Sequence, residues 1–132
     1  MAFPDSRFMT LPVDDTFGFH GMEFEMAVRH NLPFIGQVGD DTMWSAEHQV
    51  QLRKCGPERA PGYVWRLSRY DEVAEVSGGQ GENVIMPAER APARERSRAS
   101  GIPAGVNVAV QRTPGPVVPR AAAQQARDGG GP

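Results

Sequence analysis

Short apolar segments alternate with helix-favouring stretches along most of this chain, and this alternation constrains the fold more than any other feature. The apolar segments have the length of buried strands, and the stretches between them suit helices. Such alternation is typical of α/β domains and argues against an all-α or all-β chain. The predicted strands are 8–11, 33–39 and 106–110, and the predicted helices are 20–30, 43–54 and 70–76.

Two of these elements have ends that the sequence marks. Pro12 cannot donate a hydrogen bond to a neighbouring strand, so the segment 8–11 is expected at a sheet edge or a strand end. The helix 20–30 is expected to stop where Asn31 takes a left-handed conformation ahead of Pro33.

The stretch 88–99 fits this scheme less well. It is rich in helix-forming residues, yet apart from Pro92 it holds no apolar side chain larger than alanine. A helix there would have no apolar stripe and would be polar on all sides. We therefore expect it to dock weakly.

Composition limits the classes of partner. The net charge is −2, so the chain has no basic field to hold a nucleic-acid backbone or an anionic membrane surface, and neither partner is expected. Residues 112–132 have too little apolar surface to offset the entropy lost on ordering. We predict one folded domain over 4–111 and a disordered C-terminal tail over 112–132.

The cysteine and histidine content indicates no metal or thiol chemistry. Cys55 is the only cysteine, so it cannot form an internal disulfide, and a reduced, cytoplasmic setting is expected. No base pairs with it in the sequence pattern, and the three histidines do not stand at zinc-ligand spacing from it. An inert cysteine is the preferred interpretation.

Paired aspartates follow the first two predicted strands, Asp14 and Asp15 after one and Asp40 and Asp41 after the other. The carboxyl ends of parallel strands meet at one edge of a sheet, where ligands collect. Carboxylates from two neighbouring strand ends would suit a hard cation such as Mg²⁺, which can bridge to a phosphate. The alternative is that these residues only form turns, which is the commoner role of aspartate between elements.

A longer stretch carries a specific resemblance. Residues 14–34 read Asp-Asp-Thr-Phe-Gly-Phe-His-Gly-Met-Glu-Phe-Glu-Met-Ala-Val-Arg-His-Asn-Leu-Pro-Phe. This segment resembles the signature of thiamine-diphosphate enzymes of the acetolactate synthase and oxalyl-CoA decarboxylase group. There, a Gly-Asp-Gly-Ser-Phe turn leads into a helix ending Ala-Val-Arg-His-Asn-Leu-Pro, and the next strand closes in an Asn-Asp turn. The resemblance continues through 69–73, 78–82 and 99–108.

The resemblance implies a fold and a set of metal ligands. The fold would be an incomplete three-layer α/β/α domain with a parallel sheet, truncated at its N-terminus, that binds thiamine diphosphate through Mg²⁺. Asp14 matches the motif aspartate and Asp40 the motif asparagine, and Thr42 matches the residue that supplies a main-chain carbonyl to the ion. Trp44 falls where the family often places an aromatic residue near the cofactor, although a single tryptophan is more often part of a core.

The turn that would bind the diphosphate departs from the family. Asp15, Thr16 and Phe17 match the residues whose amides bind the phosphate oxygens, as the dipole at a helix N-terminus favours. The two motif glycines are replaced here by Val13 and Asp15. Because Asp15 adds a side chain and a negative charge beside the diphosphate, we expect a lower affinity for the cofactor.

Three arginines form a second departure. Arg90, Arg94 and Arg98 stand where the family commonly has leucine or a similar residue, and their spacing by four puts them on one helical face. Apolar anchors worth about 1.5–3 kcal/mol each when buried would be replaced by charges. We expect this face to meet water rather than to form a functional basic stripe.

The resemblance also implies partners and an activity. Enzymes of this group have a pyrimidine-binding domain, which supplies the glutamate that activates the cofactor, and a middle domain, both upstream of this segment. The first hypothesis is therefore a fragment or subunit that binds thiamine diphosphate and Mg²⁺ and is completed by a partner chain in an oligomer. It would act as a carboligase or decarboxylase on a 2-oxo acid or an acyl-CoA. The second hypothesis is a non-catalytic relic or interaction module. The features that favour it are Pro12, Asp15 and the three arginines.

Overall fold

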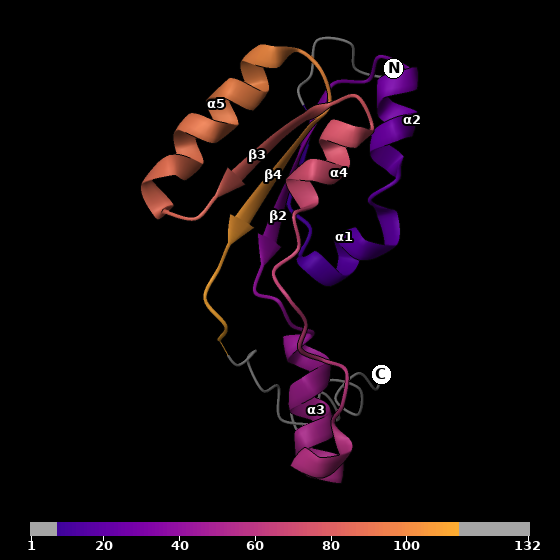
Figure 1. Cartoon of the computed structure of the whole chain (residues 1–132), viewed down its shortest axis with the longest axis vertical. Coiled ribbons are helices and arrows are strands. Elements are labelled where there is room, and N and C mark those ends of the chain that lie inside the picture. The colour runs from indigo at the N-terminus through magenta and orange to yellow at the C-terminus, as the bar shows by residue number, and fades with distance from the viewer. Residues whose placement is uncertain (1–7, 114–132) are drawn as a thin grey trace, which may run out of the picture.

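Residues 8–113 are described by a computed structural model, and they form a parallel sheet with helices against both of its faces (Figure 1). The sheet has four strands in the order β1-β2-β4-β3, and every neighbouring pair is parallel. This topology confirms the predicted α/β fold. The strands are β1 (Phe8–Thr10), β2 (Phe34–Asp40), β3 (Gln80–Val84) and β4 (Ala104–Ala109).

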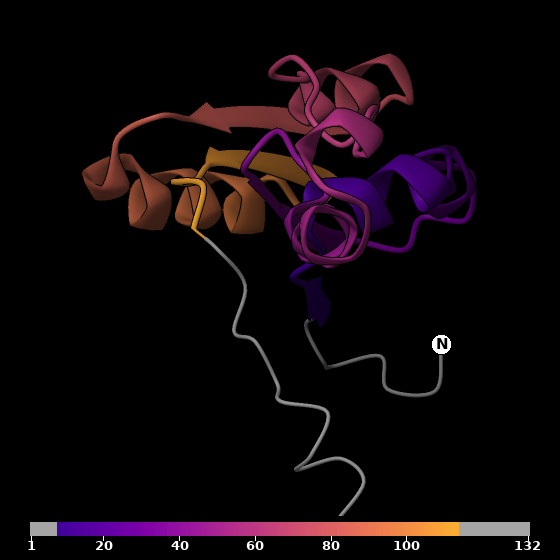
Figure 2. The same cartoon turned by 90° about the horizontal axis from the view of Figure 1, so that it is seen from below.

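Helices form two outer layers, as the predicted three-layer domain requires. On one face of the sheet lie α1 (Asp14–His20), α2 (Glu23–Arg29) and α4 (Tyr70–Val76), and on the other lies α5 (Arg90–Ser100) (Figures 1 and 2). Below the carboxyl end of the sheet in Figure 1, α3 (Ser45–Cys55) projects away from the layers. Two short 3₁₀ turns span Pro57–Arg59 and Pro87–Glu89.

A buried cluster holds each helical layer to the sheet. Gly105 of β4 lets α4 approach closely, because a Cβ at this position would lie 2.8 Å from the Cβ of Ala74. Burial of apolar area, at about 25 cal/mol per Å², drives both contacts. The cluster beneath α1, α2 and α4 contains Phe17, Phe24, Val38 and Ala74, and the cluster beneath α5 contains Val84, Ala93, Val106 and Val108.

The helix predicted over 20–30 has the wrong beginning. The structure has two helices instead, α1 and α2, and the first begins at Asp14. Asp14 and Asp15 lie in the first turn of α1, where negative charge favours a helix N-terminus, and Gly21 lies at the break between the helices. The predicted end is confirmed, since Asn31 has a left-handed φ of 50° just beyond α2.

The stretch 88–99 contains most of α5, and its expected surroundings are partly right. Arg90, Arg94 and Arg98 are all exposed, which confirms that this face meets water. The replacement of apolar family anchors at these positions stays a prediction. The helix instead buries a stripe of small side chains, Ala93 at 0% and Ser97 at 1% exposure, which lets its backbone lie close to the sheet.

The strand assignments differ mainly at β3. The edge position expected for the first strand is confirmed, because β1 pairs only with β2 among the described strands. The sequence gives no sign of β3, since Val84 is its only buried residue and its centre is polar. Part of its stability comes from an ion pair with α5, in which Arg96 Nη2 lies 2.7 Å from Glu82 Oε2.

Most of the predicted tail, residues 114–132, lies outside the described residues. Arg112, near its start, is described, and its Nε donates a hydrogen bond of 2.9 Å to the main-chain oxygen of Asp41. The boundaries expected at 4–111 stay a prediction.

Candidate metal and cofactor site

The carboxyl ends of β1 and β2 bring two aspartates together. Asp14 is the first residue of α1, which follows β1, and Asp40 is the last residue of β2. The two segments run side by side here, because Val13 forms a parallel bridge with Gly39 and the Gly39 amide donates to the Pro12 oxygen at 3.0 Å. The convergence of the two acidic turns that the sequence predicts is therefore present.

Both aspartates are buried with one oxygen left over. Asp14 is only 2% exposed and Asp40 only 1%. Asp14 Oδ1 accepts a hydrogen bond of 2.9 Å from the Asp15 amide. Asp40 Oδ1 accepts one of 2.9 Å from the Thr42 amide. Within residues 8–113, the buried Oδ2 of each has no hydrogen-bond partner.

Electrostatics makes this pair unfavourable without a cation. Burial and the neighbouring Asp40 carboxyl raise the pKa of Asp14 to about 6. Ionising both buried carboxyls costs free energy, because each negative charge disfavours the other. A divalent cation would pair both oxygens, and carboxylate oxygens are the ligands that hard cations prefer. The residues present therefore fit a bound Mg²⁺ in their donor chemistry.

Thr42, the expected carbonyl ligand, is strained and already engaged. Its φ of 59° is left-handed, which costs a β-branched residue about 1–2 kcal/mol. Its carbonyl oxygen accepts the Trp65 amide at 3.1 Å and lies 3.4 Å from Arg112 Nη2. The structure thus brings Thr42 next to Asp40, but a metal bond from this oxygen would compete with the bond from Trp65.

Asp41 follows the alternative interpretation of the acidic pairs. Its Oδ1 accepts the Met43 amide at 3.1 Å, and its Oδ2 accepts the Ser45 hydroxyl at 2.6 Å. Both oxygens therefore stabilise the turn that leads into α3.

In the expected diphosphate turn, a side chain of the turn itself occupies the Thr16 amide. The Asp15 carboxylate accepts hydrogen bonds from the Thr16 amide and from Thr16 Oγ1, the latter at 3.1 Å. The Phe17 amide donates to the Val13 oxygen at 2.9 Å as the first bond of α1. The Phe17 ring points into the core, 5.0 Å from the ring of Tyr70. An incoming phosphate would have to displace Asp15 from the Thr16 amide.

A cavity of about 700 Å³ lies beside Asp14 and Asp15. Its lining combines the acidic side chains of Asp14 and Asp15 with aromatic residues: Phe19, Trp44, Trp65 and Tyr70. Trp44 lies among them, with its ring centroid 6.0 Å from that of Trp65 and 6.1 Å from that of Phe19. The predicted position of Trp44 near the site agrees with this geometry.

The segment 63–70 contributes Trp65, Arg66, Ser68 and Tyr70 to the lining of the cavity, and sequence reasoning did not single it out. Val64 forms an antiparallel bridge with Met43, and the main-chain oxygen of Ser68 accepts Asn107 Nδ2 at 3.0 Å. The signal available was the aromatic alternation at Tyr63 and Trp65 after a glycine, in a stretch otherwise read as a connection.

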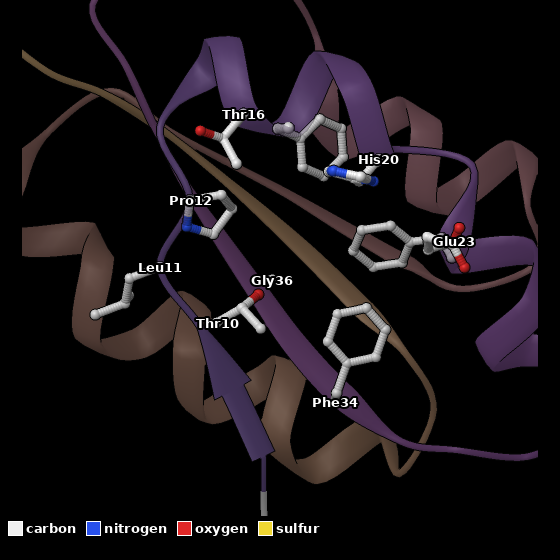
Figure 3. A pocket seen from close by; sticks show the side chains of 10 residues that line it. Thr10, Leu11, Pro12, Thr16, His20, Glu23, Phe34 and Gly36 are labelled. Atoms are coloured by element: carbon white, nitrogen blue, oxygen red, sulfur yellow. The ribbon is translucent and has the colours of Figure 1, made fainter.

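A second cavity, of about 390 Å³, lies behind α1 (Figure 3). It is framed by the end of β1, by β2 and by α1 and α2, and its lining is mainly apolar. Leu11, Pro12 and Phe34 line it, with His20 and Glu23 at its polar side (Figure 3). This recess borders β1, the edge strand of the described sheet. Its lining includes none of the four aspartates named above.

The remaining candidates gain no support. Within residues 8–113, no group of three or more histidine, cysteine, aspartate and glutamate side chains is placed to hold a metal ion. Cys55 is a free, exposed thiol. Among the helices of the described part, none is both long and apolar enough to cross a bilayer.

Comparison with curated proteins finds related sequences. The chain is 41% identical over 112 residues to a probable acetolactate synthase of Mycobacterium bovis and to the acetolactate synthase large subunit IlvG of Mycobacterium tuberculosis. It is 28% identical over 115 residues to 2-hydroxyacyl-CoA lyase 2 of Bos taurus. These matches cover 82–83% of this chain but only 18–20% of the relatives, so the chain spans about a fifth of their length. No family model matches.

Solved structures share the fold. A thiamine diphosphate-dependent 4-hydroxybenzoylformate decarboxylase of Rhodococcus jostii RHA1 superposes with a TM-score of 0.76, over 86% of this chain and 21% of that one, at 17% identity. Benzoylformate decarboxylase of Polynucleobacter necessarius gives a TM-score of 0.78 over 88% and 22%, at 15% identity. At these identities the likeness establishes the fold alone.

Proposed function

We propose that this chain, which belongs to the thiamine-diphosphate-dependent family of acetolactate synthases and 2-hydroxyacyl-CoA lyases, binds Mg²⁺ and thiamine diphosphate at the carboxyl end of its sheet. The observation that carries this proposal is the pair of buried, unpartnered oxygens on Asp14 and Asp40. Buried polar atoms are nearly always partnered, so two such oxygens side by side point to a ligand that the protein itself does not supply.

Each predicted site residue has a role in this proposal. Asp14 and Asp40 hold the ion through Oδ2, and Thr42 adds its carbonyl once the bond from Trp65 is given up. The turn of Asp15, Thr16 and Phe17 holds the diphosphate at the start of α1. When bound, the cofactor supplies the nucleophile for making or breaking a carbon–carbon bond beside a carbonyl. The substrate class we propose is a 2-oxo acid or an acyl-CoA.

A partner chain completes the site in this proposal. The chain spans about a fifth of its curated relatives, and the pyrimidine side of the cofactor needs a further domain. The exposed apolar side chains of Phe8 and of Leu11, which lines the recess of Figure 3, support a packing surface for that partner within an oligomer. The free, exposed thiol of Cys55 supports a reducing, cytoplasmic setting.

The test is calorimetric titration of the full chain with thiamine diphosphate, with and without Mg²⁺. We expect binding that requires Mg²⁺ and disappears in Asp14→Ala. Glu58→Ala, which removes the same charge from an exposed position outside the cavity, serves as the control and should bind as the wild type does. Circular dichroism of both variants separates loss of the site from loss of the fold.

A second candidate is a non-catalytic member of the same family. The observation in its favour is the Asp15 carboxylate, which occupies the Thr16 amide where the diphosphate would bind. A folded wild-type chain that shows no heat of binding at millimolar thiamine diphosphate and Mg²⁺ would favour this candidate and end the enzymatic proposal.

A further inference from the structure

One arginine stands in the wall of the acidic cavity without a partner. Arg66 lines the cavity together with Asp14 and Asp15, and no other lysine or arginine of the described residues lines it. Arg66 nevertheless forms no ion pair with either aspartate or with any other residue in the range 8–113. Its guanidinium is therefore available to an anion that enters the cavity.

The backbone on both sides of Arg66 is fixed to the sheet. On one side, the Tyr63 oxygen accepts the Trp44 amide at 2.9 Å, beyond the end of β2. On the other, the Ser68 oxygen accepts Asn107 Nδ2 from the middle of β4 at 3.0 Å. The main chain thus holds Arg66 at the cavity while its exposed side chain stays free to reorient.

The acidic end of the cavity needs such a charge. Asp15 puts a carboxylate where its family has glycine, and this carboxylate takes the Thr16 amide. A diphosphate that binds here meets Asp15 as well as the Asp14–Asp40 pair, and one divalent ion does not neutralise all of them. We propose that Arg66 binds a phosphate group of the ligand and so compensates for the charge of Asp15, an inference that rests on the proposed function. A guanidinium can hold two phosphate oxygens at once.

The chain carries its own probe for this inference. It has two tryptophans, Trp44 and Trp65, and both line the cavity. Intrinsic fluorescence therefore reports directly on a ligand that enters. The full chain is titrated with inorganic diphosphate and, separately, with thiamine diphosphate, each with Mg²⁺. The variants are Arg66→Gln and Arg66→Lys, with Arg59→Gln, an exposed residue outside the cavity, as the control for net charge.

We expect Arg66→Gln to raise the dissociation constant of diphosphate about tenfold or more, the effect of losing a charge-assisted hydrogen bond. The dissociation constant for Arg66→Lys should lie between those of the wild type and Arg66→Gln, because lysine keeps the charge but cannot hold two phosphate oxygens in the paired geometry. Arg59→Gln should stay within about twofold of the wild type. Because Arg66 is exposed and unpaired, thermal unfolding of all three variants should match the wild type.

The outcomes separate the two proposals. If Arg66→Gln binds both ligands as Arg59→Gln does while Asp14→Ala abolishes the Mg²⁺-dependent binding, the role of Arg66 is wrong and the cofactor site stands. If diphosphate binds in an Arg66-dependent way and thiamine diphosphate does not bind, the role of Arg66 stands and the proposed function is wrong. If neither ligand changes the fluorescence of the folded chain, both are overturned.

Discussion

Asp15 gives the amide of Thr16 an internal acceptor, so an external anion would have to displace this side chain to reach that amide. Asp15→Gly removes the competing carboxylate and its charge and restores the glycine of the family turn. We expect it to tighten binding of thiamine diphosphate with Mg²⁺ by about tenfold, or roughly 1.4 kcal/mol. Calorimetric titration beside the wild type measures the change.

Asp15→Asn is the matched control for this substitution, because it removes the charge and keeps the side chain. It should bind between the wild type and Asp15→Gly. A glycine variant that binds no more tightly than the wild type would show that the Thr16 amide does not take part in binding.

Asp14 makes the stability of the metal-free chain depend on pH. Its pKa is raised from 3.8 to about 6, first by burial and then by the Asp40 carboxyl, so the folded chain holds the proton more tightly than the unfolded chain. The stability it contributes is full below about pH 3.8 and is lost as the pH rises through about 6. We therefore expect the free energy of unfolding to fall across this window.

Urea denaturation between pH 4 and 7, with and without Mg²⁺, checks this slope. Asp14→Asn cannot titrate and should flatten it, and Mg²⁺ should oppose the loss above pH 6 by pairing the ionised carboxyls. A wild-type slope that persists unchanged in Asp14→Asn would assign the effect to another group.

At the scale of elements, α5 shows how a helix without large apolar residues can hold to a sheet. Ala93 is fully buried against the α5 side of the sheet, whereas Arg94 faces water. Ala93→Leu overpacks this contact and should lower the free energy of unfolding by about 1–3 kcal/mol. Arg94→Leu should change it by no more than about 0.5 kcal/mol. Urea denaturation of both variants decides the point, since a stabilising Arg94→Leu would place that face in a core.

The sequence predicted those elements whose apolar pattern is local. Helix α4 was placed over 70–76, where the structure has it, and strand β2 within a residue. The predicted helix boundaries were wrong where tertiary packing determines them. The structure has the break between α1 and α2 at Gly21, where a Cβ would lie 3.0 Å from the Phe17 ring. Nothing in the local spacing of residues 20–30 reveals this contact.

The candidate site divides in the same way. The convergence of Asp14 and Asp40 follows from parallel strands alone, so the sequence could place it once the fold class was known. Trp65 and Arg66 could not be placed, because they depend on one bridge to Met43 and one side-chain bond from Asn107, made across the fold. Contacts of this kind have no period in the sequence to mark them.

For the whole molecule, the outer edge of β1, which has no partner strand within residues 8–113, is the surface that most needs covering. Phe8 of β1 and Leu11 just after it are each 66% exposed, and Leu11 lines the recess of Figure 3. An unpaired strand edge with large apolar side chains favours association with another chain. We expect the full chain at micromolar concentration to self-associate reversibly, and the double variant Phe8→Ser, Leu11→Ser to weaken that association at least tenfold. Sedimentation velocity over a concentration series measures both.

The control for this surface lies on α4 and beyond β3. Val76→Ser with Ile85→Ser removes two exposed apolar side chains, 84% and 63% exposed, from elsewhere in the molecule and should leave the association unchanged. Each side chain buried at an interface contributes about 1.5–3 kcal/mol, so loss of Phe8 and Leu11 exceeds the tenfold threshold if they are covered. Equal effects of the two double variants would mean nonspecific association. The β1 edge would then not be the face on which a second chain completes the cofactor site.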